Sequence, residues 1–351
     1  MDSSVAAFLL RDAGVACEAV FLRLYDGCPP DGAASGTHRI INGARFLARD
    51  VAGILGIPFS ILDFRPRFIK NVIDPFVASY LAGDTPNPCV DCNRYIKFGE
   101  LVDYAGARGF AHIATGHYAR IEQDRATGRF LLAKGADASK DQSYMLYSLT
   151  QRQLARVKFP VGGMLKSAVR STAENLGLPN AKIRESQDIC FIQNGRYMDF
   201  IKKYSGLEQP DGPIVDNTGA AVGRHKGAAG YTIGQRKGLG LAMPDPVYVY
   251  AKSVAENKVY VGAEHLLYSK HMDVRDINLI PLIKLSAPMR VRVKTRYRHA
   301  EQPAVIEQIS DDSVRVEFDA PQRAITGGQA AVFYDGDMVV GGGTIVKNPD
   351  I

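Results

Sequence analysis

The chain has 351 residues, which is enough for two or three domains that each bury a core. With 46% hydrophobic residues, no apolar run long enough to span a bilayer and no secretory signal pattern, it is expected to be cytoplasmic, with no membrane partner. A net charge of +6 fits a nucleic-acid partner but is too small to indicate one alone. Five scattered cysteines exclude a disulfide scaffold, so the thiols are expected to be buried, catalytic or metal-binding.

Helical and strand-like patterns alternate up to about residue 195, which predicts an α/β domain with a doubly wound parallel sheet. The short polar side chains of Asp2, Ser3 and Ser4 are typical of a helix start, and apolar residues follow them. A buried strand that includes Cys17 and Leu22 comes next. Further elements are predicted in this order: helix 44–55, strand 59–64, helix 68–81, helix 95–105, strand 112–116, helix 142–156 and helix 165–176.

Glycine-rich turns and short alternating strands follow residue 205 and predict small β domains, the last of them a barrel. The strands are expected at 246–250, 258–261, 289–294, 313–318 and 330–334. We therefore predict three domains: a catalytic domain at 1–205, a central β-rich domain at 206–263 and a C-terminal β-barrel at 264–351.

The stretch TPNPCVDCNRYIKF, at 85–98, is the most specific local signal. Its two prolines, one of them Pro88 after Asn87, restrict the backbone and make the loop stiff. Cys89 and Cys92 have the C-x-x-C spacing of a zinc half-site, an iron–sulfur half-site or a redox pair. Zinc is disfavoured because the chain offers no second close pair of ligands. The alternative of two idle loop thiols is stronger for Cys89 than for Cys92.

Three further stretches contain candidate site residues. In ATGHYAR, Gly116 and His117 follow a short strand, at the edge where open α/β sheets bind ligands. SKDQSYMLY is a polar loop that leads into a predicted helix, and helix capping would explain it. SQDICFIQNGRYMDF places Cys190 among apolar residues, where a thiol is most often inert.

Together these stretches resemble the tRNA-specific 2-thiouridylase family over essentially the whole chain. The shared motifs, in chain order, are TPNPxxxCNxxIKF, ATGHYAR, KDQSY, SQxICFI, YTIGQRKGLG, KTRYR and GGQAAVFYDGD. The resemblance implies an ATP pyrophosphatase domain, of the adenine nucleotide alpha hydrolase type, followed by a small β domain and a tRNA-binding barrel. It also implies a tRNA-uridine 2-sulfurtransferase that replaces the C2 oxygen of the wobble uridine, U34, with sulfur.

The resemblance assigns roles to individual residues. ATP, with Mg²⁺, would adenylate the C2 oxygen; Cys190 would carry a persulfide from a sulfur-donor protein or cysteine desulfurase, and Cys92 would free its sulfur by forming a disulfide. The nucleotide would contact Asp2, Ser3, Leu22 and Gly116. The tRNA, through its anticodon loop and backbone, would contact Asn87, Pro88, Cys89, His117, Lys140, Asp141, Gln142, Arg296, Tyr297 and Gln329.

Two departures from the family pattern leave alternatives open. Many members have Asp at the position of Cys89, so Cys89, Cys92 and Cys190 could instead hold three corners of a 4Fe–4S cluster. The family's SGGxDSS phosphate loop would begin before Met1, which indicates a start codon assigned too late or, less favoured, a true truncation. The rival functions are a non-catalytic RNA-binding remnant and an ATP pyrophosphatase that acts on a small molecule.

Overall fold

The computed structural model describes residues 1–26, 37–183, 189–192 and 197–346. The chain divides into two compact units, each considered by itself below. Unit 1 comprises Met1–Ile73, Cys89–Asn194 and Asp337–Val339, and unit 2 comprises Asp74–Pro88, Gly195–Gly336 and Val340–Ile351. The domain boundaries at 205 and 264 remain predictions.

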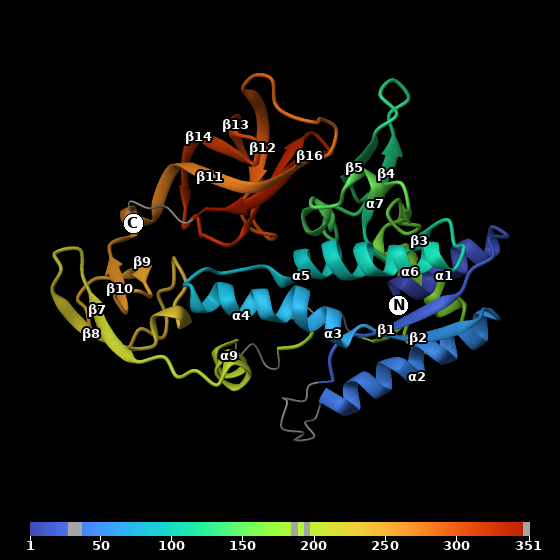
Figure 1. Cartoon of the computed structure of the whole chain (residues 1–351), viewed down its shortest axis with the longest axis horizontal. Coiled ribbons are helices and arrows are strands. Elements are labelled where there is room, and N and C mark those ends of the chain that lie inside the picture. Colours follow the sequence, from blue (N-terminus) through green and yellow to red (C-terminus); the bar gives the residue numbers. More distant parts are fainter. Residues whose placement is uncertain (27–36, 184–188, 193–196, 347–351) are drawn as a thin grey trace. The chain divides into compact units, whose positions relative to one another are not determined.

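Parallel strands form the centre of unit 1, as the sequence predicts. Strand β1 (Ala19–Arg23) pairs in parallel with β2 (Phe59–Asp63), and β3 (Ile113–Ala114) pairs in parallel with β6 (Val157–Lys158). Within the described part of the chain these are two separate two-stranded sheets. Figure 1 shows helix α2 (Thr37–Leu55) running beside β1 and β2.

Helix α1 (Asp2–Asp12) is packed between α2 and α8 (Lys166–Asn175). Val5 and Ala6 of α1 are fully buried against side chains such as Leu55 and Val169. Burial of one such aliphatic side chain contributes about 1.5–3 kcal/mol, so this apolar cluster fixes the start of α1 relative to the helices around it. The predicted N-terminal helix is present, and Ser4, Val5 and Ala6 are its buried residues.

In two helical segments the backbone hydrogen-bond pattern changes from α-helical to π-helical and back. The first joins α3 (Arg65–Phe68), the π-helical η1 (Ile69–Ile73) and α4 (Asp74–Leu81), and the second joins α5 (Pro88–Asp91), the π-helical η2 (Cys92–Glu100) and α6 (Leu101–Ala107). The predicted helices at 68–81 and 95–105 are therefore present, and both begin earlier. Because π-helical turns often occur at functional sites, η2 points to the cysteine-bearing segment.

The predicted helix at 142–156 is wrong. This segment contains the 3-10 turn η3 (Ser143–Leu146) and, after a break, the short helix α7 (Gln151–Leu154). The buried Asp141 carboxylate accepts hydrogen bonds of 3.1 and 2.8 Å from the backbone N–H and the hydroxyl of the first η3 residue. Such local bonds compete with helix formation. Thr150 then starts α7 with a capping box.

Unit 1 also contains an antiparallel hairpin that the alternating pattern did not predict. It is formed by β4 (Ala119–Gln123) and β5 (Phe130–Lys134), which pair from Ala119–Lys134 to Gln123–Phe130. Arg120 extends from this hairpin to the Asp337 carboxylate, 3.2 Å away, in the short segment of unit 1 that comes from the end of the chain.

The middle of unit 2 is a four-stranded sheet with the order β8-β7-β10-β9. Its strands are β7 (Asp211–Val215), β8 (Ala221–Lys226), β9 (Tyr248–Ser253) and β10 (Lys258–Gly262). Besides α4, the described part of unit 2 contains the short helices α9 (Tyr197–Ser205), η4 (Ala228–Gly230) and η5 (Glu264–Leu267). The strands predicted at 246–250 and 258–261 are confirmed as β9 and β10.

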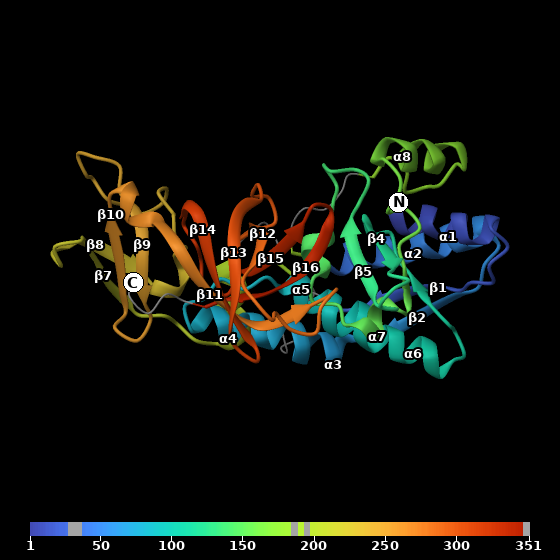
Figure 2. The same ribbon diagram turned by 90° about the horizontal axis from the view of Figure 1, so that it is seen from above.

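A closed barrel ends the described chain, as predicted, and Figure 2 shows its strands in orange to red. Its order is β11-β14-β13-β12-β15-β16, and pairing of β11 with β16 closes it. The strands are β11 (Tyr268–Leu279), β12 (Met289–Lys294), β13 (Gln302–Ser310), β14 (Ser313–Arg323), β15 (Ala330–Asp335) and β16 (Met338–Ile345). Closure pairs strand edges that would otherwise be open.

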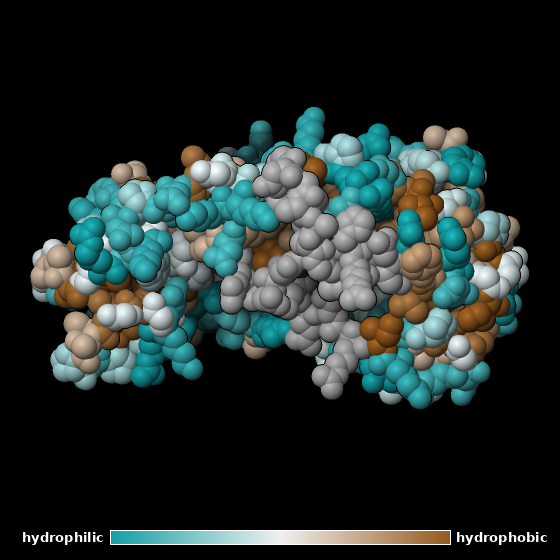
Figure 3. All heavy atoms as spheres, turned by 90° about the horizontal axis from the view of Figure 1, so that it is seen from below, coloured by the Kyte–Doolittle hydropathy of each residue, from teal (hydrophilic) through white to brown (hydrophobic). Residues whose placement is uncertain are grey.

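Hydrophilic side chains cover most of the described surface on the face shown in Figure 3, with hydrophobic patches between them. Among the helices that the structure describes, none is both long enough and apolar enough to cross a membrane.

Candidate active site

The end of β3 brings Gly116 against the first turn of α1. A methyl group at Gly116 would lie 2.4 Å from the backbone nitrogen of Ser3 and 2.5 Å from the carbonyl carbon of Asp2, so only glycine fits there. The structure therefore brings these three predicted nucleotide contacts together. The side-chain cap expected at the start of α1 is wrong, because no side chain caps this helix.

The Asp2 side chain instead belongs to a polar network that the sequence analysis missed. Lys166 donates to both carboxylate oxygens of Asp2, at 2.7 and 2.8 Å, and the Tyr118 hydroxyl donates to one of them at 2.8 Å. The Lys166 ammonium also lies 5.4 Å from the centre of the Tyr118 ring. Only 11% of the Lys166 side chain is exposed, so this ion pair is shielded from solvent.

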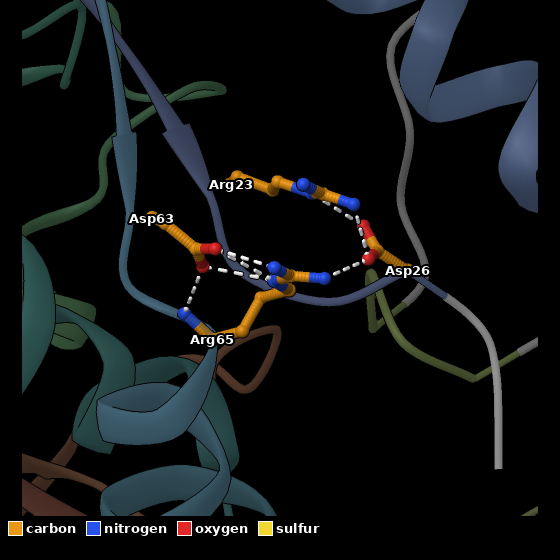
Figure 4. A network of polar contacts seen from close by, with 4 residues as sticks. All are labelled: Arg23, Asp26, Asp63 and Arg65. Atoms are coloured by element: carbon orange, nitrogen blue, oxygen red, sulfur yellow. Dashed lines mark hydrogen bonds and ion pairs between the residues drawn. The ribbon is translucent and has the colours of Figure 1, made fainter. Parts of the chain in front are cut away.

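Leu22 lies in β1, one residue before a chain of ion pairs at the carboxyl ends of β1 and β2. Figure 4 shows how Arg23 and Arg65 share the Asp26 carboxylate, while Arg65 also holds Asp63. Hydrogen bonding from Arg65 lowers the pKa of Asp63 to about 2. The network ties the ends of the two strands together and thereby fixes the backbone next to Leu22.

The three candidate thiols form one electrostatic group. Cys92 begins η2 and is buried, whereas Cys89 and Cys190 are solvent-exposed, and none of the three is in a disulfide within the described part of the chain. Burial, reinforced by the neighbouring Cys190 and Cys89, raises the pKa of Cys92 to about 12. The protein packed around Cys190, together with Cys89, raises the pKa of Cys190 to about 11. Phe191 anchors this last thiol by an edge-on contact with Phe68, whose ring centre is 5.7 Å away.

Lys97, which the sequence analysis also missed, is the cation of this group. Surrounding protein partly desolvates all three thiols and raises the pKa of Cys89, Cys92 and Cys190, and the charge of Lys97 partly offsets that effect at each of them. The IKF part of the cysteine motif contains this lysine, but its sequence position gives no sign that it faces the thiols.

His117 is half-buried, and the charge of Lys97 acts on it as it does on the thiols. Its Nδ1 is 2.8 Å from the Thr115 hydroxyl, and its ring lies 5.5 Å from that of Phe98 and 5.8 Å from that of Phe159. Burial, with the charge of Lys97, lowers the pKa of His117 well below its usual value. The imidazole is therefore neutral at neutral pH.

The KDQSY segment is linked to both His117 and Cys92 through their chain neighbours. The Gln142 side chain accepts a 3.0 Å hydrogen bond from the backbone N–H of Tyr118. Asn93, which follows Cys92 and is buried, donates a 3.0 Å hydrogen bond to the carbonyl of Met145 in η3. Lys140 and Asp141 belong to the same segment, and Asp141 has the turn-forming role described above.

Unit 2 brings its own predicted tRNA contacts near the start of the cysteine motif. Gln329 donates a 2.7 Å hydrogen bond to the carbonyl of Thr85, two residues before Asn87 and three before Pro88. Arg296 donates to the Thr326 hydroxyl at 2.8 Å, and the backbone N–H of Gln329 donates to the Thr326 carbonyl at 3.3 Å. Tyr297 follows Arg296 and is partly exposed.

The thiol group does not fit a metal centre as it stands. Across the residues that the structure describes, which include Cys89, Cys92 and Cys190, no set of three His, Cys, Asp or Glu side chains is placed to hold a metal ion. Cys28 lies outside the described residues, and Cys17, expected in a buried strand, precedes β1 and is partly exposed.

Comparison with protein families defines the class. Residues 1–194 match the model of the tRNA methyl transferase HUP domain, 198–263 that of the tRNA methyl transferase PRC-barrel domain, and 269–345 that of the aminomethyltransferase β-barrel domain. The chain is thus a HUP-domain protein of the tRNA-modification type with two appended β domains, which confirms the predicted fold class.

Curated relatives identify the family. The chain is 48% identical to the tRNA-specific 2-thiouridylase MnmA of Heliobacterium modesticaldum, over 100% of this chain and 91% of the relative. It is 48% identical to the MnmA of Moorella thermoacetica, over 98% of this chain and 96% of the relative. It is 41% identical to the MnmA of Clostridioides difficile, over 99% of this chain and 96% of the relative. The chain belongs to the tRNA-specific 2-thiouridylase family, and neither rival function is favoured.

Proposed function

We propose that this protein is a tRNA-uridine 2-sulfurtransferase, which uses ATP to replace the C2 oxygen of the wobble uridine with sulfur. The observation that carries the proposal is the electrostatic grouping of Cys92 with Cys190 in a chain that is similar to 2-thiouridylases along its whole length. The reaction requires the Sγ atoms of Cys92 and Cys190 to come within bonding distance of each other during sulfur transfer.

The nucleotide would bind where Gly116 meets the first turn of α1, with Asp2 and Ser3 beneath its phosphates and Leu22 beside its base. Backbone N–H groups at a helix start suit the approach of an anion, and Gly116 lets the start of α1 pack closely against the end of β3. Mg²⁺, as in other ATP-dependent reactions, would neutralise phosphate charge. The uridine C2 oxygen attacks the α-phosphorus, pyrophosphate leaves, and the oxygen becomes part of a good leaving group.

Sulfur transfer then balances within the thiol pair. The terminal sulfur of the Cys190 persulfide attacks C2, and the C–O bond breaks as AMP leaves. The Cys92 thiolate attacks Sγ of Cys190, and the electrons of the persulfide S–S bond pass to the sulfur on C2. The products are 2-thiouridine and a Cys92–Cys190 disulfide, which an external thiol must reduce before the next turnover.

The anticodon loop supplies a uridine that can be unstacked and turned into the site at low cost. Asn87, Pro88, Cys89 and His117 would surround this base, with Lys140, Asp141 and Gln142 next to it. Arg296, Tyr297 and Gln329 would hold the RNA backbone, which positions the substrate without reading its sequence. A sulfur-donor protein or a cysteine desulfurase in the cytoplasm would load Cys190.

The test is thiolation of unmodified tRNA in the presence of ATP, Mg²⁺ and a persulfide donor, with 2-thiouridine quantified by mass spectrometry. Cys92→Ser and Cys190→Ser should each reduce product by at least about a hundredfold, because each removes a sulfur that forms or breaks a bond. Cys17→Ser is the matched control and should retain activity. Full activity of either site variant would contradict the proposal.

A further inference from the structure

The π-helical register of η2 places Lys97 one turn after Cys92. In an α-helix, residues five apart differ by about 140° around the axis, so their side chains point in different directions. In a π-helix the hydrogen bond itself runs between residues five apart, as it does from the N–H of Leu101 to the carbonyl of Ile96 at the end of η2. The change of register therefore turns Lys97 toward the face that presents Cys92.

The charges around Lys97 come from several elements. Its ammonium interacts with the thiols of Cys89 and Cys92 on its own helical segment, with Cys190 and with the His117 imidazole. Asp91 is the acidic group of this cluster, and burial, partly offset by Arg94, raises its pKa to about 6. In the described part of the chain, Lys97 forms no ion pair with a carboxylate.

We propose that Lys97 provides a local positive potential for sulfur anions, and that it is a positioning residue that acts through the thiols of Cys92 and Cys190. Its ammonium attracts the terminal sulfur of a persulfide on Cys190 and stabilises the charge on Cys92 during attack. Lys97 itself neither gives up a proton nor forms a bond. This inference rests on the proposed function, since it assigns the sulfur anions to that reaction.

The sharpest test compares two alkylating reagents on the same thiol in the full chain without ATP or tRNA. Iodoacetate is negatively charged and iodoacetamide is neutral, and both react with the thiolate. The ratio of their rates therefore cancels the fraction of thiolate and reports the local potential. Mass spectrometry measures the ratio separately at Cys92, Cys190 and Cys17, the last of which lies outside the cluster.

Lys97→Met should lower the iodoacetate-to-iodoacetamide ratio at Cys92 and Cys190 by about fivefold, the size expected for one unit charge at about 4 Å in a water-like medium. Lys97→Arg should retain the ratio, and Cys17 should not change. The matched control is Lys70→Met, because Lys70 is an exposed lysine in the other π-helical segment. In the wild type, added salt should lower the ratio at the two site thiols.

An unchanged ratio in Lys97→Met, an equal fall at Cys17, or a fall of equal size in Lys97→Arg would overturn the assignment. If Lys97→Met fails to fold, the salt series on the wild type is the deciding measurement. The assignment is then overturned if the iodoacetate-to-iodoacetamide ratio at Cys92 equals that at Cys17 and does not change with salt concentration. Failure of the proposed function is distinguishable, because a protein with the Lys97-dependent ratio but no tRNA thiolation contradicts only the reaction.

Discussion

Two lysines of unit 1 stand in opposite electrostatic situations. Lys166 is held by both oxygens of Asp2 and by the face of Tyr118, whereas the charge of Lys97 acts on three thiols and the His117 imidazole. The first charge is compensated and fixes geometry where the nucleotide is proposed to bind. The Lys97 charge, which has no carboxylate partner among the described residues, is proposed to stabilise transient sulfur anions. A paired charge should therefore matter most for folding, and an uncompensated one for reactivity.

The largest effect on stability is expected from Lys166→Met. Removing one partner of a fully buried ion pair costs about 3–5 kcal/mol, because the remaining charge is left unpaired. Since 27% of the Asp2 side chain is exposed, we expect about 2 kcal/mol here. Urea unfolding would measure the loss, and Lys166→Met combined with Asp2→Asn should recover part of it. A loss of unfolding free energy below about 0.5 kcal/mol would contradict the stabilising role given to the Lys166–Asp2 ion pair.

Tyr118→Phe should have a smaller effect. The substitution keeps the buried ring and the cation–π contact but removes the hydroxyl that donates to Asp2. A hydrogen bond to a charged group contributes about 1.5 kcal/mol, and we expect a loss near 1 kcal/mol because Lys166 still pairs with the carboxylate. The measurement is again urea unfolding, and a loss larger than that of Lys166→Met would show that the hydroxyl, not the ammonium, fixes Asp2.

The thiol group should make the free energy of unfolding depend on pH. The pKa of Cys92 is about 12 in the folded protein and about 8.5 in an unfolded chain, so the folded state binds more protons between these values. Its contribution to stability is complete below about pH 8.5 and is lost as the pH rises toward 12. Between pH 8 and 10 the wild type should lose about 2 kcal/mol more than Cys92→Ala. Equal slopes in the two proteins would contradict the buried setting of Cys92.

Lys97→Met should have the smallest effect on stability, below about 0.5 kcal/mol, because Lys97 is only partly buried and holds no carboxylate among the described residues. The same substitution should still change thiol reactivity. Thermal unfolding beside the alkylation ratio tests both statements on one sample. A loss of stability close to that of Lys166→Met would remove the contrast between the two lysines.

Local patterns predicted most of the fold, and long-range contacts decided the rest. Alternation predicted β9, β10, β12, β14 and β15, because a half-buried strand imposes a period of two on its own residues. Helix 142–156 failed because Asp141 bonds to Ser143, and the turn chemistry of that pair overrides helix propensity.

The candidate site shows the same division. Family motifs in the sequence singled out the cysteines, Gly116 and His117, whose interactions the structure now describes. Lys166 could not be predicted, because its partner Asp2 is 164 residues away in the chain and no local pattern records the pair. Lys97 could not be predicted for a different reason. At α-helical spacing it would not share a helix face with Cys92, and the π-helical hydrogen-bond pattern that brings the two together cannot be predicted from a single sequence.

The central claim, that sulfur passes through Cys190 and Cys92 without a metal cluster, is tested most directly by substituting Cys89. Protein purified without oxygen should contain no stoichiometric iron or sulfide, and Cys89→Asp and Cys89→Ser should keep thiolation within about threefold of the wild type, since neither removes a sulfur that forms or breaks a bond. About four irons per chain, lost in Cys89→Ser together with thiolation, would contradict the claim and make Cys89 a cluster ligand.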